Sequence, residues 1–190
     1  GKVRRLNEDS FLTHDGAFVV ADGMGGHQAG DVASRLVIEA VAARVANGTP
    51  EISSLGEVVR AANDLVRSHS GDVGREGMGS TFVSLFLVRN AAEESLVVVN
   101  VGDSRCYELV DGLMRQVTTD HSEVQELVAQ GLIRPEEAAT HPERNVVTRA
   151  IGIEDVVAGD FFVLPERAAS RILLCSDGVW APLGSGRMRT

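Results

Sequence analysis

The chain has 190 residues, 44% of them hydrophobic, with a formal net charge of -9 and a pI near 5.0. Its length suits one domain, which would bury roughly 70% of the surface of the unfolded chain. The acidic balance excludes a nucleic-acid partner, and no apolar run approaches the roughly 20 residues of a membrane span. We expect a single domain over residues 1–190, a monomer without a membrane segment.

The two cysteines, Cys106 and Cys175, lie in separate strand-like runs and show no CxxC spacing. A zinc site or a disulfide framework would place cysteines in closer or more numerous patterns. We therefore expect two small buried apolar side chains in a reducing compartment, in keeping with a cytoplasmic location.

The first part of the chain predicts a hairpin followed by two helices. Apolar runs at 11–13 and 17–21 flank Asp15-Gly16, a dipeptide typical of tight turns. Apolar positions at helical spacing then predict helices over 31–45 and 55–66, the second closed by Gly71. A loop rich in glycine and charge follows to residue 79.

Strand-like runs dominate the second part, and we expect them to form an antiparallel meander. They cover 81–88, 95–101, 105–110 and 113–117. Ser122 to Gln125 has the pattern of a capping box that opens a short helix to Gln130, and Pro135 begins another. Two last strands, 160–164 and 171–176, are expected to pair with each other. Helices clustered between runs of strands indicate an α+β fold with sheets inside and helices outside.

Three apolar runs that read as buried strands stop at an aspartate beside a glycine. These ends are Asp22-Gly23, Gly102-Asp103 and Asp177-Gly178. A carboxylate at the end of a buried strand is costly to desolvate unless positive charge meets it, and no Lys or His lies beside any of the three. A divalent metal ion is the simplest source of that charge.

Other chemistries fit less well. The glycine-rich string 21–30 lacks the third glycine of a dinucleotide fingerprint, because Gln28 occupies its place, and the chain has neither a P-loop nor an EF-hand calcium loop. A different two-metal hydrolase, such as a phosphodiesterase, would need histidine-rich ligation. Taken singly, each Asp-Gly end could equally be an ordinary solvated turn.

Taken in order, these strings resemble the PPM family of metal-dependent serine/threonine protein phosphatases (type 2C), in its bacterial form. The resemblance is carried by Arg4-Arg5-Leu6-Asn7-Glu8-Asp9, Asp22-Gly23-Met24-Gly25-Gly26-His27, Gly79-Ser80-Thr81, Asn100-Val101-Gly102-Asp103-Ser104-Arg105, Thr118-Thr119-Asp120-His121-Ser122, the segments 141–145 and 148–152, and Ser176-Asp177-Gly178.

The resemblance implies a fold and a metal centre. The fold would be a four-layer αββα sandwich of two mainly antiparallel sheets flanked by helices, here C-terminally truncated. Two Mn²⁺ or Mg²⁺ ions, with a looser third, would lie at one end of the sandwich. Oxygen ligands suit these hard ions. The metal-binding residues implied by the resemblance are Asp22, which bridges both ions, the Gly23 carbonyl, Asp177, Asp103 at the third ion, and Asp9 with Glu8 through coordinated water.

The implied activity is hydrolysis of phosphoserine and phosphothreonine in proteins by a metal-activated water. Arg4 would bind the phosphate, since its planar guanidinium matches two phosphate oxygens. His27 would donate a proton to the leaving alkoxide. His121 is expected in the capping turn rather than in catalysis. The partners would be phosphorylated proteins and a cognate serine/threonine kinase system.

The chain departs from the family pattern near its end. Family members carry a further metal-binding Asp downstream of the Ser-Asp-Gly turn, whereas residues 178–190 contain neither Asp nor Glu. We expect one metal ligand to be missing, the polar tail to leave part of the sandwich uncovered, and one ion to bind more weakly. A non-catalytic sensor or scaffold domain of the same fold is therefore the alternative to an active phosphatase.

Overall fold

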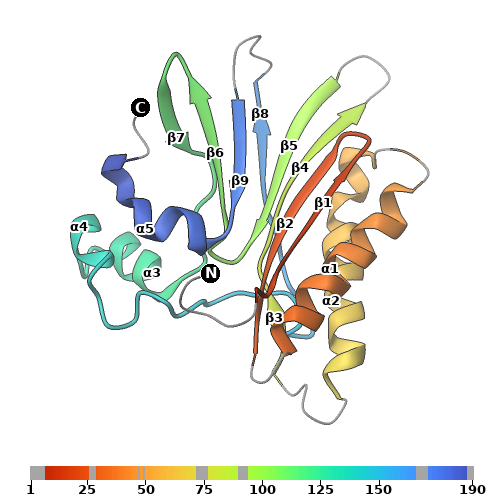
Figure 1. The fold of residues 1–190 in the computed structure, drawn as a ribbon, viewed down its shortest axis with the longest axis horizontal. Helices are drawn as coiled ribbons and strands as arrows, with labels where there is room; N and C mark the ends of the chain where they lie inside the picture. The colour runs from red at the N-terminus through yellow and green to blue at the C-terminus, as the bar shows by residue number, and fades with distance from the viewer. Residues whose placement is uncertain are drawn as a thin grey trace.

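The structure is a computed structural model that describes residues 7–25, 29–46, 48, 50–71, 77–89, 94–165 and 171–187. Within these ranges the chain forms two facing β-sheets with helices outside them (Figure 1). This architecture confirms the predicted α+β fold. None of the helices in the described ranges has the length and apolar character needed to cross a bilayer.

The first sheet has six strands in the order β1-β2-β4-β5-β8, and β3 extends it alongside β2. Its described pairs are all antiparallel. The predicted hairpin is confirmed, with Asp15 and Gly16 at positive φ in its turn. The strands are β1 (Asp9–His14), β2 (Ala17–Met24), β3 (Gly79–Ser80), β4 (Phe82–Arg89), β5 (Glu94–Val101) and β8 (Asp160–Leu164).

The second sheet has three strands in the order β7-β6-β9, namely β7 (Leu113–Gln116), β6 (Arg105–Val110) and β9 (Arg171–Cys175). The predicted meander is wrong, because the chain leaves the first sheet after β5 and enters the second at β6. The predicted pairing of β8 with β9 is also wrong, since β8 pairs with β5 and β9 with β6. Neighbours in sequence often pair in a sheet, but in a sandwich the connection can instead cross between layers.

Two long helices, α1 (Ala29–Val45) and α2 (Leu55–Ser70, preceded by the 3₁₀ turn Ile52–Ser54), cover the outer face of the first sheet (Figure 1). Both were predicted, and α2 ends at Ser70 with Gly71 as its C-cap, as expected. The central part of the loop predicted after it, 72–76, lies outside the described residues.

The fourth layer consists of short helices gathered near the lower end of the second sheet in Figure 1. They are α3 (Glu123–Ala129), α4 (Pro135–Ala138) and α5 (Asp177–Arg187). Helix α5, which was not predicted, occupies part of the polar tail. The expected capping box at Ser122 is wrong: its side chain makes no cap hydrogen bond, and the Gln125 N–H donates to the Ser122 backbone carbonyl at 3.1 Å instead.

The core has two parts because alternate residues of the first sheet face opposite ways. Phe82 and Phe86 pack against α1 and α2, whereas Val83 and Leu85 join Cys106 between the two sheets. Both cysteines are free and buried, as expected. Burial raises the pKa of Cys106 to about 12, with smaller contributions from Cys175 and Glu108.

Candidate metal centre

Four predicted acidic ligands lie at or next to the ends of strands, and these strand ends lie at the lower end of the two sheets in Figure 1. Asp9 and Asp22 face each other directly across the β1–β2 pair. Asp103 lies on the turn that carries the chain from β5 to β6, and Asp177 opens α5 just after β9. The Ser176 hydroxyl donates to Asp9 Oδ2 at 3.2 Å, so the ends of β1 and β9 are in contact. Residues from both sheets therefore meet at this edge.

The electrostatics of Asp22 show how closely these acids interact. Burial, which is the largest cause, together with the charges of Asp9, Asp177 and Asp103 and a hydrogen bond to Asp9, raises the pKa of Asp22 to about 8. A carboxyl group held this far from its ordinary pKa lacks compensating positive charge. Asp22 is thus the centre of a group of four acids, Asp9, Asp22, Asp103 and Asp177, which we call the acidic cluster.

Asp103 shows the same tendency to a smaller degree. Burial raises its pKa to about 6, helped by the charges of Asp120 and Asp177 and opposed by Arg105. Arg105 donates hydrogen bonds to Asp120, through Nε at 2.9 Å and Nη2 at 2.6 Å. Its charge lowers the pKa of Asp103 by less than burial raises it. The acidic cluster therefore lacks a dedicated cationic partner among the described residues.

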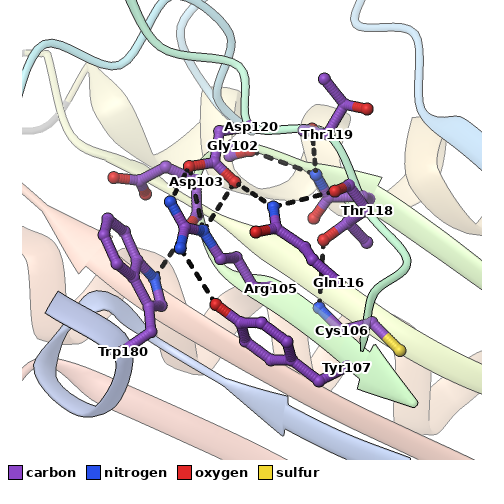
Figure 2. A network of polar contacts seen from close by, with 11 residues as sticks. Gly102, Asp103, Arg105, Cys106, Tyr107, Gln116, Thr118, Thr119, Asp120 and Trp180 are labelled. Carbon is purple, nitrogen blue, oxygen red and sulfur yellow. Dashed lines mark hydrogen bonds and ion pairs between the residues drawn. The ribbon is translucent and has the colours of Figure 1, made fainter. Parts of the chain in front are cut away.

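A network of polar contacts holds the far side of the Asp103 turn (Figure 2). The Trp180 indole N–H donates to the Asp103 carbonyl at 3.1 Å, and the Arg105 guanidinium lies 3.5 Å from the centre of the Trp180 ring. Arg105 also donates to the Tyr107 hydroxyl at 3.0 Å, and Gln116 donates to Asp120 at 3.0 Å. This network ties α5 to the second sheet beside the acidic cluster.

A cavity of about 430 Å³ opens next to this network. Its walls come from β6, β7 and the segment that holds α3 and α4, and include Asp103, Tyr107, Trp180, Pro135 and Arg144. One wall is thus shared with the acidic cluster, and the others combine aromatic, apolar and cationic groups.

Gly23 has a packing reason to be glycine. A Cβ on Gly23 would overlap the backbone carbonyl of Gly30 in α1, and the Gly23 N–H donates to the Glu8 carbonyl at 3.1 Å. The close approach of α1 to β2 fixes the backbone of the strand beside Asp22.

Arg4 and His27, the predicted catalytic residues, lie outside the described residues. Three buried residues near the acids were not predicted to be functional. Thr81 and Ser104 share a hydrogen bond, and His121 binds the backbone of Gly102 on both sides. The sequence did hold a signal for Thr81, because the Gly79-Ser80-Thr81 string was one of those that carry the family resemblance and had no assigned role.

The fit of a cation can be judged from the donors themselves. In the described part of the chain, no three His, Cys, Asp or Glu side chains are grouped as a formed metal site. The donors are nevertheless carboxylates, which Mn²⁺ and Mg²⁺ prefer, and a cation would relieve the repulsion that raises the pKa of Asp22. By this test, the residues present fit a divalent ion.

Fold and site together define a class: α+β sandwich proteins with an acidic cluster at one end of the two sheets. A sequence profile described as protein phosphatase 2C matches residues 3–188. The chain belongs to this family, as the sequence motifs predicted. Among its relatives is the serine/threonine phosphatase stp of Listeria innocua, 38% identical over 191 residues that cover 94% of this chain and 74% of the relative.

Solved structures agree with this assignment. The serine/threonine phosphatase PstP/Ppp of Mycobacterium tuberculosis superimposes with a TM-score of 0.87 at 39% identity, covering 97% of this chain and 78% of that one. The catalytic domain of PstP in complex with two manganese ions gives a TM-score of 0.82 at 38% identity, covering 97% and 76%. The predicted fold class is therefore confirmed.

Proposed function

We propose that this chain is a metal-dependent protein serine/threonine phosphatase domain, which hydrolyses phosphoserine and phosphothreonine by means of a water molecule activated at the acidic cluster. The observation that carries the proposal is the position of Asp22. Its half-buried carboxyl group faces three other acids and has a pKa raised to about 8. Family membership and the named phosphatases among its relatives support the same activity.

Each acid would have a different role in binding the cations. Asp22 lies among the other three and would bridge two ions, with the Gly23 carbonyl and Asp177 completing their contacts. Asp103 would serve a third, looser ion, and Asp9 would act through coordinated water. When bound, Mn²⁺ or Mg²⁺ would lower the pKa of a water and offset the charge of the phosphate. The manganese ions in the PstP catalytic domain favour Mn²⁺.

The substrate end of the site would use Arg4 and His27. The Arg4 guanidinium would bind two phosphate oxygens and orient the phosphorus toward the water. His27 would hold a proton for the serine or threonine alkoxide, a poor leaving group. Both roles rest on the sequence motifs alone.

The same proposal extends to partners and location. The substrates would be phosphorylated proteins, which a cognate serine/threonine kinase must supply. The acidic charge and the two free cysteines fit a monomer working in the reducing cytoplasm.

Asp22→Asn tests the activity. We expect the wild-type chain to hydrolyse a phosphothreonine peptide with millimolar Mn²⁺, and Asp22→Asn to lose about a hundredfold or more in rate, since a shared ligand is removed. Phosphate release is measured at several Mn²⁺ concentrations.

Asp111→Asn is the matched control. It removes the same charge from an exposed turn residue with φ of 51°, a conformation that Asn tolerates. Its rate should equal that of the wild type. Equal and metal-independent rates for wild type and Asp22→Asn would contradict the proposal and favour a non-catalytic sensor or scaffold domain.

A further inference from the structure

We propose that Thr81 is a positioning residue for the metal centre, whose side-chain hydroxyl fixes the Asp22 and Asp103 backbones relative to each other. The inference rests on the proposed function and on Asp22 and Asp103 as metal ligands.

Strand β2 faces β4 and then β3 in one unbroken antiparallel register, from Ala17 opposite Phe86 to Met24 opposite Gly79. This register places Thr81 opposite Asp22. Opposite residues of an antiparallel ladder alternate between hydrogen-bonded and non-hydrogen-bonded pairs, and in a hydrogen-bonded pair the two residues exchange both backbone N–H···O=C bonds. The Thr81 N–H does donate to the Asp22 carbonyl at 2.9 Å, but the Asp22 N–H donates to Thr81 Oγ1 at 2.9 Å. A side-chain hydroxyl thus replaces a backbone carbonyl at the metal-ligand position.

The same hydroxyl reaches the second acid-bearing segment. Thr81 Oγ1 lies 2.6 Å from the Ser104 Oγ, which follows Asp103 in the turn between the sheets. Thr81 and Ser104 are 2% and 0% exposed, so water does not compete for this bond. One atom therefore connects the backbone of Asp22 to the turn that carries Asp103.

The methyl group of Thr81 packs against the other half of that turn. Gly102 has φ of +104°, and a Cβ there would come within 2.8 Å of Thr81 Cγ2. His121 holds Gly102 from the opposite side, by accepting its N–H at Nδ1 (3.0 Å) and donating its own N–H to the Gly102 carbonyl (3.0 Å). The turn that carries Asp103 thus lies between Thr81 and His121. Its residues Gly102 and Asp103 are labelled in Figure 2.

This arrangement uses both branches of the threonine side chain, and the two can be separated by mutation. Thr81→Val keeps the shape and removes the hydroxyl, whereas Thr81→Ser keeps the hydroxyl and removes the methyl group. Ser84→Ala is the matched control, because Ser84 is a fully buried hydroxyl on β4 whose bond goes to the Val99 carbonyl.

The primary readout is Mn²⁺ binding rather than turnover. Trp180, the single tryptophan of the chain, donates to the Asp103 carbonyl and so reports binding by its fluorescence; calorimetry provides an independent dissociation constant. We expect Thr81→Val to weaken Mn²⁺ binding by about tenfold or more, the range for residues that orient metal ligands. At saturating Mn²⁺, its kcat should fall while the KM for phosphopeptide stays within about twofold of the wild type.

Thr81→Ser and Ser84→Ala should bind Mn²⁺ within about threefold of the wild type, whatever their stability toward urea. If Thr81→Val does not fold, Ser104→Ala, which removes the partner hydroxyl, should show the same weakened binding. Wild-type affinity in Thr81→Val or Ser104→Ala would overturn the inference, as would equal losses in Thr81→Ser and Thr81→Val. A wild type that binds Mn²⁺ without turnover would contradict the proposed function alone.

Discussion

Burial and three neighbouring acids raise the pKa of Asp22 to about 8, which favours the protonated form of its carboxyl group at neutral pH in the metal-free protein. A divalent ion must then displace a proton, so metal binding at this edge should strengthen as the pH rises toward 8. The cost of holding these acids together without metal is therefore itself dependent on pH.

The stability of the metal-free protein should report that cost. Since the pKa of Asp22 in the folded chain exceeds its ordinary 3.8, the folded state binds more protons between pH 4 and 8. The contribution of Asp22 to the free energy of unfolding is fully present below about pH 4. It is lost as the pH rises through 8, by up to about 1.4 kcal/mol per pH unit. Urea unfolding in a metal chelator from pH 5 to 8 measures this slope.

Asp22→Asn removes the titrating group and should flatten the profile over the same range, whereas Asp111→Asn should retain the wild-type slope. An Asp22→Asn profile as steep as that of the wild type would show that the raised pKa does not govern stability. Asp103, whose pKa is raised to about 6, contributes a smaller decline at lower pH in all three proteins.

At the scale of elements, the contact between α1 and β2 decides where Asp22 lies. The two elements meet at Gly23 and Gly30 with no room for a side chain on Gly23. Helical periodicity predicted α1, and an apolar run beside an Asp-Gly turn predicted β2, because both patterns are local. The close approach of α1 to β2 depends on how the helix packs on the sheet. Neither local pattern encodes that packing, so it was not predictable.

Gly23→Ala should therefore destabilise the fold, since its methyl group must displace the Gly30 backbone. We expect a loss of about 1–3 kcal/mol in the free energy of unfolding, as for overpacked cores. Gly56→Ala, in α2 and facing open space, is the control and should be neutral or stabilising by about 0.5–1 kcal/mol. Urea denaturation compares the two, and an unchanged Gly23→Ala would mean that the helix moves without cost.

At the scale of the whole molecule, the acidic cluster joins the two sheets. Asp9 and Asp22 belong to the first sheet, Asp177 follows the last strand of the second, and Asp103 lies between them. An ion bound to ligands from both sheets would oppose their separation on unfolding. Metal binding should consequently stabilise the entire fold rather than one loop.

Mn²⁺ at about a hundred times its dissociation constant should raise the free energy of unfolding by about 2.7 kcal/mol for one site. Differential scanning fluorimetry with and without a chelator measures the shift. The shift should be larger at pH 8 than at pH 6, since fewer protons compete, and should shrink in Asp22→Asn but not in Asp111→Asn. A pH-independent shift that survives Asp22→Asn would place the ion elsewhere.

The sequence by itself determined the helices α1 to α4, the first hairpin, the strand boundaries to within a few residues and the family. These features depend on local periodicity, on Asp-Gly turns and on short motifs. The Asp-Gly strand ends also indicated which acids to examine, because a buried strand that stops at a carboxylate is unusual on energetic grounds.

Only the tertiary structure decided how strands divide between the sheets and how the acids are held. The run 105–110 carries the same apolar pattern whether it pairs with β5 or crosses to the second sheet, and the crossing at Gly102 reversed our prediction. The Thr81 hydroxyl acts across 59 residues on Asp22 and 23 residues on Ser104. Such contacts follow from register and layer packing, which set long-range distances that no local pattern encodes.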